Sequence, residues 1–127
     1  MRGGEYEMGR PVIAAVDDMF FASKIRAVAE HLGLTVRFVH SAAEAVAAAR
    51  ETDASLVVAD LHSRRCDPFA LAETLKADET LRAVRLVGFF SHVETALQQR
   101  AAEAGFDRVM PRSAFSKNLP EILQNAG

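Results

Sequence analysis

Three aspartates stand directly after apolar runs of the chain. Asp17 and Asp18 follow residues 12–16, and Asp60 follows residues 56–59. Continuous apolar runs are typical of strands buried on both faces of a parallel sheet, and ligands of such sheets bind beyond the carboxyl ends of the strands. Carboxylate oxygens are the ligands that Mg²⁺ prefers in proteins. The three residues therefore indicate an acidic, metal-binding pocket. The alternative is that one of Asp17 and Asp18 caps the first helix while the other is solvated.

Apolar runs alternate with helical patterns along the chain, which predicts five strand–helix units around a parallel sheet. The predicted strands cover residues 12–16, 35–39, 55–60, 84–90 and 106–110. The first helix is predicted at about residues 22–32, and the second begins with a capping box at Ser41 and Glu44 and runs through Arg50. The third is predicted from Asp67 and Pro68 to about Lys76, and the fourth from a second capping box at Ser91 and Glu94 to Gly105. The last is predicted at about 117–125, beginning at Asn118 or Leu119 so that Pro120 lies in its first turn.

Length and charge restrict the class of protein. The chain has 127 residues, enough for one domain, which we place at residues 11–127 after a flexible leader at residues 1–10. A net charge of -2 argues against a nucleic-acid partner. The apolar stretches are too short for a membrane span, and no signal segment is evident, so a cytoplasmic location is expected. Cys66 is the single cysteine, which excludes an internal disulfide and a cysteine-based zinc site.

The order of these elements, with acids after the first and third strands, resembles the receiver domains of two-component response regulators over about residues 11 to 126. Asp17 and Asp18 together with Asp60 are the most specific part of the match, and Asp67-Pro68 supports the same alignment. The resemblance implies a single-domain, flavodoxin-like α/β fold, a three-layer sandwich around a parallel five-stranded sheet of order 2-1-3-4-5. In that order the first and third strands are neighbours, so the three carboxylates meet.

The resemblance also implies a role for each acid. Asp60 matches the phosphoryl acceptor, Asp17 and Asp18 match the acids that hold Mg²⁺ beside Asp60, and His62 matches the residue whose backbone carbonyl contacts the metal. A carboxylate that attacks phosphorus forms an aspartyl phosphate, and cations must neutralise the charge on the phosphoryl oxygens. The resemblance therefore implies that Asp60 is the nucleophile and that Asp17, Asp18, Asp60 and the backbone carbonyl of His62 hold Mg²⁺.

Residues on the other side of the pocket depart from the family pattern. Phe90 stands where the family has a hydroxyl, and Ser91 lies one residue further, where a strand side chain points to the opposite face. Arg112 replaces a lysine and is followed by Ser113 in place of a proline. It is either a phosphate-contacting cation or, alternatively, a solvated loop cation or a partner for the acids. Val109 replaces the aromatic switch residue, so the usual route from phosphorylation to a changed surface is missing.

Two functions fit these observations. The first is a receiver-like signalling module of a phosphorelay, not an enzyme with its own catalytic output. It would accept a phosphoryl group on Asp60 from a histidine kinase or phosphotransfer protein, with Mg²⁺, and signal to a downstream protein partner. The second is a pseudo-receiver, an interaction module that is not phosphorylated. The first requires the Phe90 ring to turn away from Asp60, whereas the second allows that ring to fill the phosphoryl space. A small phosphohydrolase is disfavoured because no second aspartate stands two residues after Asp60.

Partner surfaces are predicted at two places. In the family, partners usually meet the face made by the fourth helix, fifth strand and fifth helix, here residues 93–104, 109–115 and the last helix. Met19, Phe20 and Phe21, after the acidic pair, form either an exposed docking patch or packing around the first helix. Either function is compatible with a homodimer. The four histidines are not at one metal-ligand spacing, which argues against a zinc site.

Overall fold

Five parallel strands form one sheet in the order β2-β1-β3-β4-β5, which confirms the predicted topology. The computed structural model describes residues 11–124, so the predicted leader at residues 1–10 lies outside the described residues. Strands β1 to β4 are each one residue shorter than predicted at one end or at both ends. Strand β5 begins two residues later and ends one residue later than predicted. Their bounds are Val12–Ala15 for β1, Val36–Phe38 for β2, Leu56–Asp60 for β3, Arg85–Phe90 for β4 and Arg108–Pro111 for β5.

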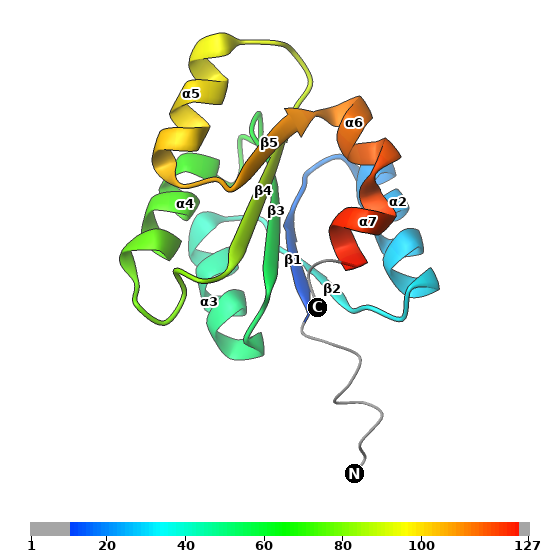
Figure 1. The fold of residues 1–127 in the computed structure, drawn as a ribbon. Coiled ribbons are helices and arrows are strands. Elements are labelled where there is room, and N and C mark those ends of the chain that lie inside the picture. The colour runs from blue at the N-terminus through cyan, green and yellow to red at the C-terminus, as the bar shows by residue number, and fades with distance from the viewer. Residues whose placement is uncertain (1–10, 125–127) are drawn as a thin grey trace.

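Helices cover both faces of the sheet and give three layers (Figure 1). One face carries α3 (Ala42–Thr52), α4 (Pro68–Ala77) and α5 (Thr95–Ala104). The other face carries α2 (Met19–His31), α6 (Arg112–Lys117) and α7 (Leu119–Gln124). Each interface holds its own cluster of buried apolar side chains. The sheet is therefore apolar on both sides, as its continuous apolar runs predict.

Side-chain caps explain where α2, α3 and α4 begin. Asp18 accepts hydrogen bonds from the amides of Phe20 and Phe21 at 2.9 and 3.0 Å, so α2 begins at Met19, three residues before the predicted start. Ser41 accepts from the Glu44 amide at 3.0 Å, which confirms the predicted cap. The Glu44 side chain accepts from the His40 amide at 2.6 Å and not from the Ser41 amide, so the second bond of the predicted capping box is made one residue earlier. The predicted start of α4 is also confirmed, because Asp67 caps this helix and Pro68 is its first residue.

One helix prediction is wrong, and one helix was not predicted. Ser91 does not cap α5, which begins at Thr95 after Glu94 without a side-chain cap. Residues 91–94 form an exposed bend instead, between the end of β4 at Phe90 and the start of α5. The helix that was not predicted is α6, which lies between β5 and α7. The predicted last helix is α7, and it begins at Leu119, one of its two predicted starts. Pro120 then lies in its first turn, as predicted, where its missing amide would have no helical partner.

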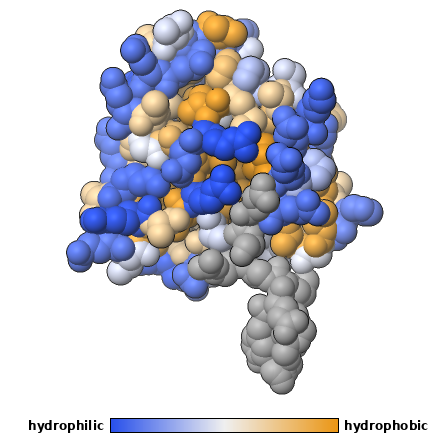
Figure 2. All heavy atoms as spheres, in the orientation of Figure 1, coloured by the Kyte–Doolittle hydropathy of each residue, from blue (hydrophilic) through white to orange (hydrophobic). Residues whose placement is uncertain are grey.

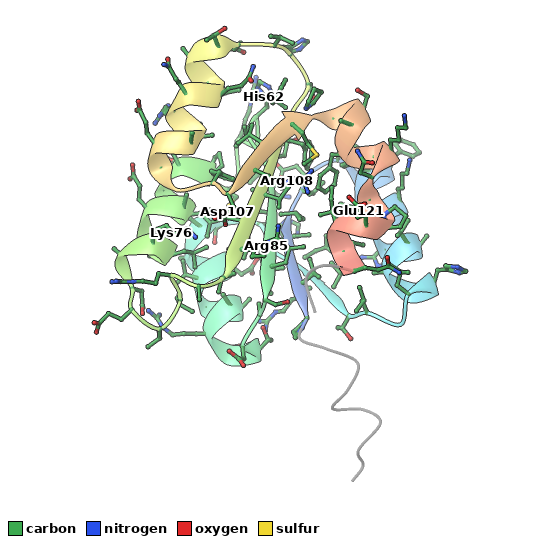
Figure 3. All side chains as sticks on the ribbon, in the orientation of Figure 1. His62, Lys76, Arg85, Asp107, Arg108 and Glu121 are labelled. Atoms are coloured by element: carbon green, nitrogen blue, oxygen red, sulfur yellow. The ribbon has the colours of Figure 1, made fainter. Side chains whose placement is uncertain are left out.

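A lysine joins the connections at the amino-terminal end of the sheet. Lys76 Nζ donates to the carbonyls of Arg82 and Val84 at 3.2 and 3.3 Å and lies 3.6 Å from Asp107 Oδ2. The same Asp107 oxygen accepts from the Leu86 amide at 2.8 Å. Figure 3 shows Lys76 and Asp107 next to one another between α4 and the sheet. The contacts of Lys76 and Asp107 hold this end of β4 in place, opposite the acidic residues.

On the face of the molecule seen in Figure 2, hydrophilic residues dominate over the helical layers, and apolar surface shows between them.

Candidate acidic site at the carboxyl ends of the strands

The strand order brings the candidate residues to one end of the sheet. β1 and β3 are paired with Ala15 opposite Ala59, so Asp17 and Asp18 follow β1 beside the place where Asp60 ends β3. Arg112 begins α6 directly after β5 and reaches the same end (Figure 1). The parallel topology therefore collects three acids and one cation from segments far apart in the sequence.

Both carboxylate oxygens of Asp18 are engaged. Oδ1 accepts the two amides that begin α2, and Oδ2 accepts a hydrogen bond from Arg112 Nη2 at 2.8 Å. The Arg112 hydrogen bond, followed by the Phe21 amide, lowers the pKa of the Asp18 carboxyl. The helix-capping alternative is thus confirmed for Asp18, and Asp18 is charged and paired.

Arg112 is held from a second side by aromatic rings. Its guanidinium carbon lies 4.3 Å above the centre of the Phe21 ring. Phe21 packs at 5.0 Å from Phe89 and 5.7 Å from Phe115, and Phe89 and Phe115 are 4.8 Å apart between ring centres. Arg112 is therefore a partner for one of the acids, which was one of its predicted alternatives. Its contact with a phosphoryl group stays a prediction.

Asp17 faces the loop after β3. Its Oδ2 accepts a hydrogen bond from Ser63 Oγ at 2.9 Å, and Ser63 Oγ accepts in turn from the Cys66 amide at 3.1 Å. The other oxygen of Asp17 is buried without a hydrogen-bond partner. Cys66 is buried as well, and burial raises the pKa of its thiol to about 11. Ser63 was not predicted, although a serine between Asp60 and a helix cap is a common signal of a hydrogen-bonded turn.

Asp60 is partly buried and accepts a hydrogen bond at Oδ1 from the His62 amide at 2.9 Å. Within residues 11–124 this is the one hydrogen bond to its side chain that the structure contains. Burial raises the pKa of Asp60, while the His62 amide and the charge of Arg112 act in the opposite direction. Within residues 11–124, Asp60 therefore differs from Asp18 in having no cation bonded to its carboxylate.

His62 lies under the segment that leads into α5 (Figure 3). Its ring meets the His92 ring edge to face at 5.8 Å between centres, and its Nε2 is buried without a hydrogen-bond partner. The predicted role of its backbone carbonyl toward a metal stays a prediction. What the structure adds is that the amide of the same residue fixes Asp60.

Phe90 turns away from Asp60. In the β3–β4 register the residue opposite Asp60 is Phe89, whose ring belongs to the cluster under α2, α6 and α7. Phe90 belongs to the cluster under α3, α4 and α5, and Val109 packs against that same cluster. Ser91 is exposed. The ring of Phe90 therefore does not fill the space beside Asp60, which is the orientation that a phosphoryl acceptor requires.

The donor chemistry suits a hard divalent cation only in part. Asp17 offers a buried, unpartnered carboxylate oxygen, and such oxygens are the ligands that Mg²⁺ prefers. In the part of the chain that the structure describes, however, no group of three or more His, Cys, Asp and Glu side chains is arranged to hold a metal ion. Asp18 is the member already engaged by a cation. The metal ligands Asp17, Asp18 and Asp60 therefore stay a prediction.

The aromatic segment at residues 19–21 was predicted to be either an exposed docking patch or packing around the first helix, and its residues take both positions. Phe21 is buried, whereas Met19 and Phe20 are 81% and 89% exposed. Phe20 and Phe21 border a groove of about 460 Å³ between α2 and α6, whose other lining residues are Lys24, Arg112, Ser113 and Ser116.

Between residues 11 and 124, no helix has the length and apolar character needed to cross a bilayer.

No family model matches this sequence, and no curated protein matches it. Solved structures do resemble its fold. The chemotaxis response regulator CheY4 of Vibrio cholerae is 13% identical with a TM-score of 0.79, over 94% of this chain and 99% of that one. The receiver domain of a sensor histidine kinase from Pseudomonas aeruginosa, described with a magnesium ion coordinated in its active-site cleft, is 20% identical with a TM-score of 0.79, over 92% and 96%. The phosphorylated cyanobacterial phytochrome response regulator RcpA is 16% identical with a TM-score of 0.75, over 92% and 90%.

Proposed function

We propose that this chain, which has the CheY-like fold of response regulator receiver domains, is a signalling module that accepts a phosphoryl group on Asp60. The observation that supports this proposal best is the environment of Asp60. Its carboxylate stands at the end of the central strand β3, one oxygen is fixed by the His62 amide, and the Phe90 ring lies in the opposite core cluster. Within residues 11–124 the second oxygen accepts no hydrogen bond, and it is the oxygen proposed to attack phosphorus.

The proposed reaction is a displacement at phosphorus. The carboxylate of Asp60 attacks, the bond between phosphorus and the donor's leaving group breaks, and the aspartyl phosphate forms. Mg²⁺, when bound at this pocket, supplies charge neutralisation for the phosphoryl oxygens. Asp17 and Asp60 would hold it, and Asp18 would join them only after parting from Arg112. Once free, Arg112 can reach a phosphoryl group with its planar fork of donors.

The donors that fit this chemistry are a histidine kinase or a phosphotransfer protein. Two of the similar folds support this assignment, since one is the receiver domain of a sensor histidine kinase and another is described as phosphorylated. The signal would pass to a downstream protein through the face formed by α5, β5, α6 and the last helix, α7. Because Val109 replaces an aromatic residue in β5, that surface would change through another part of the fold.

A second function is a pseudo-receiver that binds its partner without being phosphorylated. The Asp18–Arg112 ion pair favours it, because this contact neutralises one acid of the pocket from within the chain. The two functions differ in whether Asp60 ever carries a phosphoryl group.

The test is intact mass after incubation of the purified protein with Mg²⁺ and acetyl phosphate. The proposal expects one added phosphoryl group in the wild-type protein and none in Asp60→Asn. Asp67→Asn is the matched control, since asparagine also caps a helix and residue 67 lies outside the pocket, so this variant should be phosphorylated like the wild type. An unchanged mass in folded wild-type protein would support the pseudo-receiver instead.

A further inference from the structure

We infer that Arg112 is a built-in competitor for the divalent cation, so that Asp18 exchanges a guanidinium for a metal ion when the pocket is loaded. This inference rests on the metal pocket of the proposed function. It assigns to Arg112 control of metal occupancy, a role separate from contact with a phosphoryl group.

The first support is that Asp18 has no spare oxygen. Oδ1 is committed to the amides of Phe20 and Phe21, which begin α2, and Oδ2 is committed to Arg112 at 2.8 Å. Rotating the carboxylate to free Oδ1 would leave the first turn of the helix without its cap. A cation that takes Asp18 as a ligand must therefore bind at Oδ2, where Arg112 already lies, and the repulsion between the two positive charges favours the displacement of Arg112.

The second support is that Arg112 can leave Asp18 without losing its other contacts. Its guanidinium rests on the Phe21 ring, which also borders the groove between α2 and α6. The Arg112 side chain is 35% exposed, and Ser113 and Ser116 offer hydroxyl oxygens along the same groove. A swing about the Phe21 ring would therefore move the guanidinium from the carboxylate to hydrated groove surface, not into the apolar core.

The third support is the balance of charge. An ion pair that is about a third exposed is weakly stabilising, so a divalent cation at contact distance from two or three carboxylates can outcompete it. The guanidinium near the pocket nevertheless repels a second cation. Its charge also acts on Asp60, where it opposes the rise in pKa that burial causes. Removing Arg112 should therefore leave the pocket more negative and more receptive to metal.

The experiment is calorimetric titration of the full chain with Mg²⁺, comparing the wild type with Arg112→Met. Met keeps an apolar stem over Phe21 and removes the charge, so we expect Mg²⁺ to bind about three- to tenfold more tightly than in the wild type. Lys24→Met is the matched control. Lys24 lines the same groove but bonds to Ser116 and has no contact with Asp18, so its removal should change the affinity by less than about twofold.

A second readout follows the exchange itself. In the wild type, Mg²⁺ should shift the side-chain Nε–Hε resonance of Arg112 in an ¹⁵N spectrum, and Asp17→Asn should weaken both the shift and the binding. Equal Mg²⁺ affinities in the wild type and Arg112→Met, or an equal gain in Lys24→Met, would overturn the inference while leaving a metal site in place. Failure of every variant to bind Mg²⁺ would overturn the inference together with the metal pocket of the proposed function.

Discussion

Asp60 and Phe89 are opposite one another in register on the central strands β3 and β4. The amide of Leu61, the next residue after Asp60, donates to the Phe89 carbonyl at 2.9 Å, which fixes this register at the pocket. Because successive strand residues alternate between faces, Phe90 is committed to the other side of the sheet. The position aligned with the family's hydroxyl is therefore a core residue under α3, α4 and α5.

Replacing Phe90 by Thr should not restore a hydroxyl to the pocket. The new side chain would leave a cavity in the α3, α4 and α5 cluster and bury a hydroxyl there, and we expect the free energy of unfolding to fall by about 3 kcal/mol. Urea denaturation measures the loss, and intact mass measures phosphorylation. Phe90→Leu, which keeps most of the apolar volume, should lose less. Faster phosphorylation of Phe90→Thr than of the wild type would contradict the orientation of Phe90.

The apolar run that ends in an acid predicted the position of Asp60 at the carboxyl end of a buried strand. The strand order was implied by the resemblance to receiver domains, and the structure confirms it. Sequence patterns could not predict which of Phe89 and Phe90 faces the pocket, since both faces of β4 are apolar and the run contains no alternation. The Arg112–Asp18 pair also lay beyond local pattern, because it joins residues on α6 and the β1–α2 loop that only the tertiary fold brings together. At Ser91 the sequence pattern was misleading, because Ser91 and Glu94 have the spacing of a capping box but Ser91 does not cap a helix.

The charge of Asp60 should destabilise the fold at neutral pH. Burial raises its folded-state pKa above the ordinary value, so the folded state holds a proton that the unfolded state has lost, and stability falls as the pH rises through this interval. We therefore expect Asp60→Asn to melt at a higher temperature than the wild type at pH 7. The difference should shrink as the pH falls to about 4, where the unfolded aspartate is also protonated. A lower melting temperature for the variant at pH 7 would argue against burial as the dominant effect.

Two replacements of Asp18 separate its two contacts. Asp18→Asn keeps an oxygen for the amides of Phe20 and Phe21 but loses the charge that meets Arg112, whereas Asp18→Ala loses both. We expect the alanine variant to melt about 4 °C below the asparagine variant in thermal unfolding followed by circular dichroism.

The wild type should exceed Asp18→Asn in stability only where the carboxylate is ionised. Because Arg112 lowers the folded-state pKa of Asp18, this advantage is present above the ordinary aspartate pKa and disappears as the pH falls through the lowered value. An advantage that is independent of pH would mean that the ion pair contributes nothing to stability.

Gly88 lets β4 pack closely beneath the pocket. A Cβ at this position would lie 2.9 Å from the Phe106 ring and 3.0 Å from Leu61 Cδ2, closer than side chains pack. Gly88→Ala should therefore lower the free energy of unfolding by about 1–3 kcal/mol in urea denaturation. Adding Phe106→Leu should recover part of that loss, and strictly additive effects of the two changes would show that the Phe106 contact is not the cause.

The C-terminal wall of the molecule consists of α6 and α7, each six residues long. Helices of this length do not persist on their own, so they depend on the buried side chains of Phe115, Leu119, Ile122 and Leu123. Phe115 also stacks on Phe89 and Phe21, the ring that carries Arg112. A random mutagenesis screen for loss of signalling would consequently return hits at Leu119 and Leu123. Such hits would report the mechanical support of the Arg112 side chain and would not mark a surface for recognition.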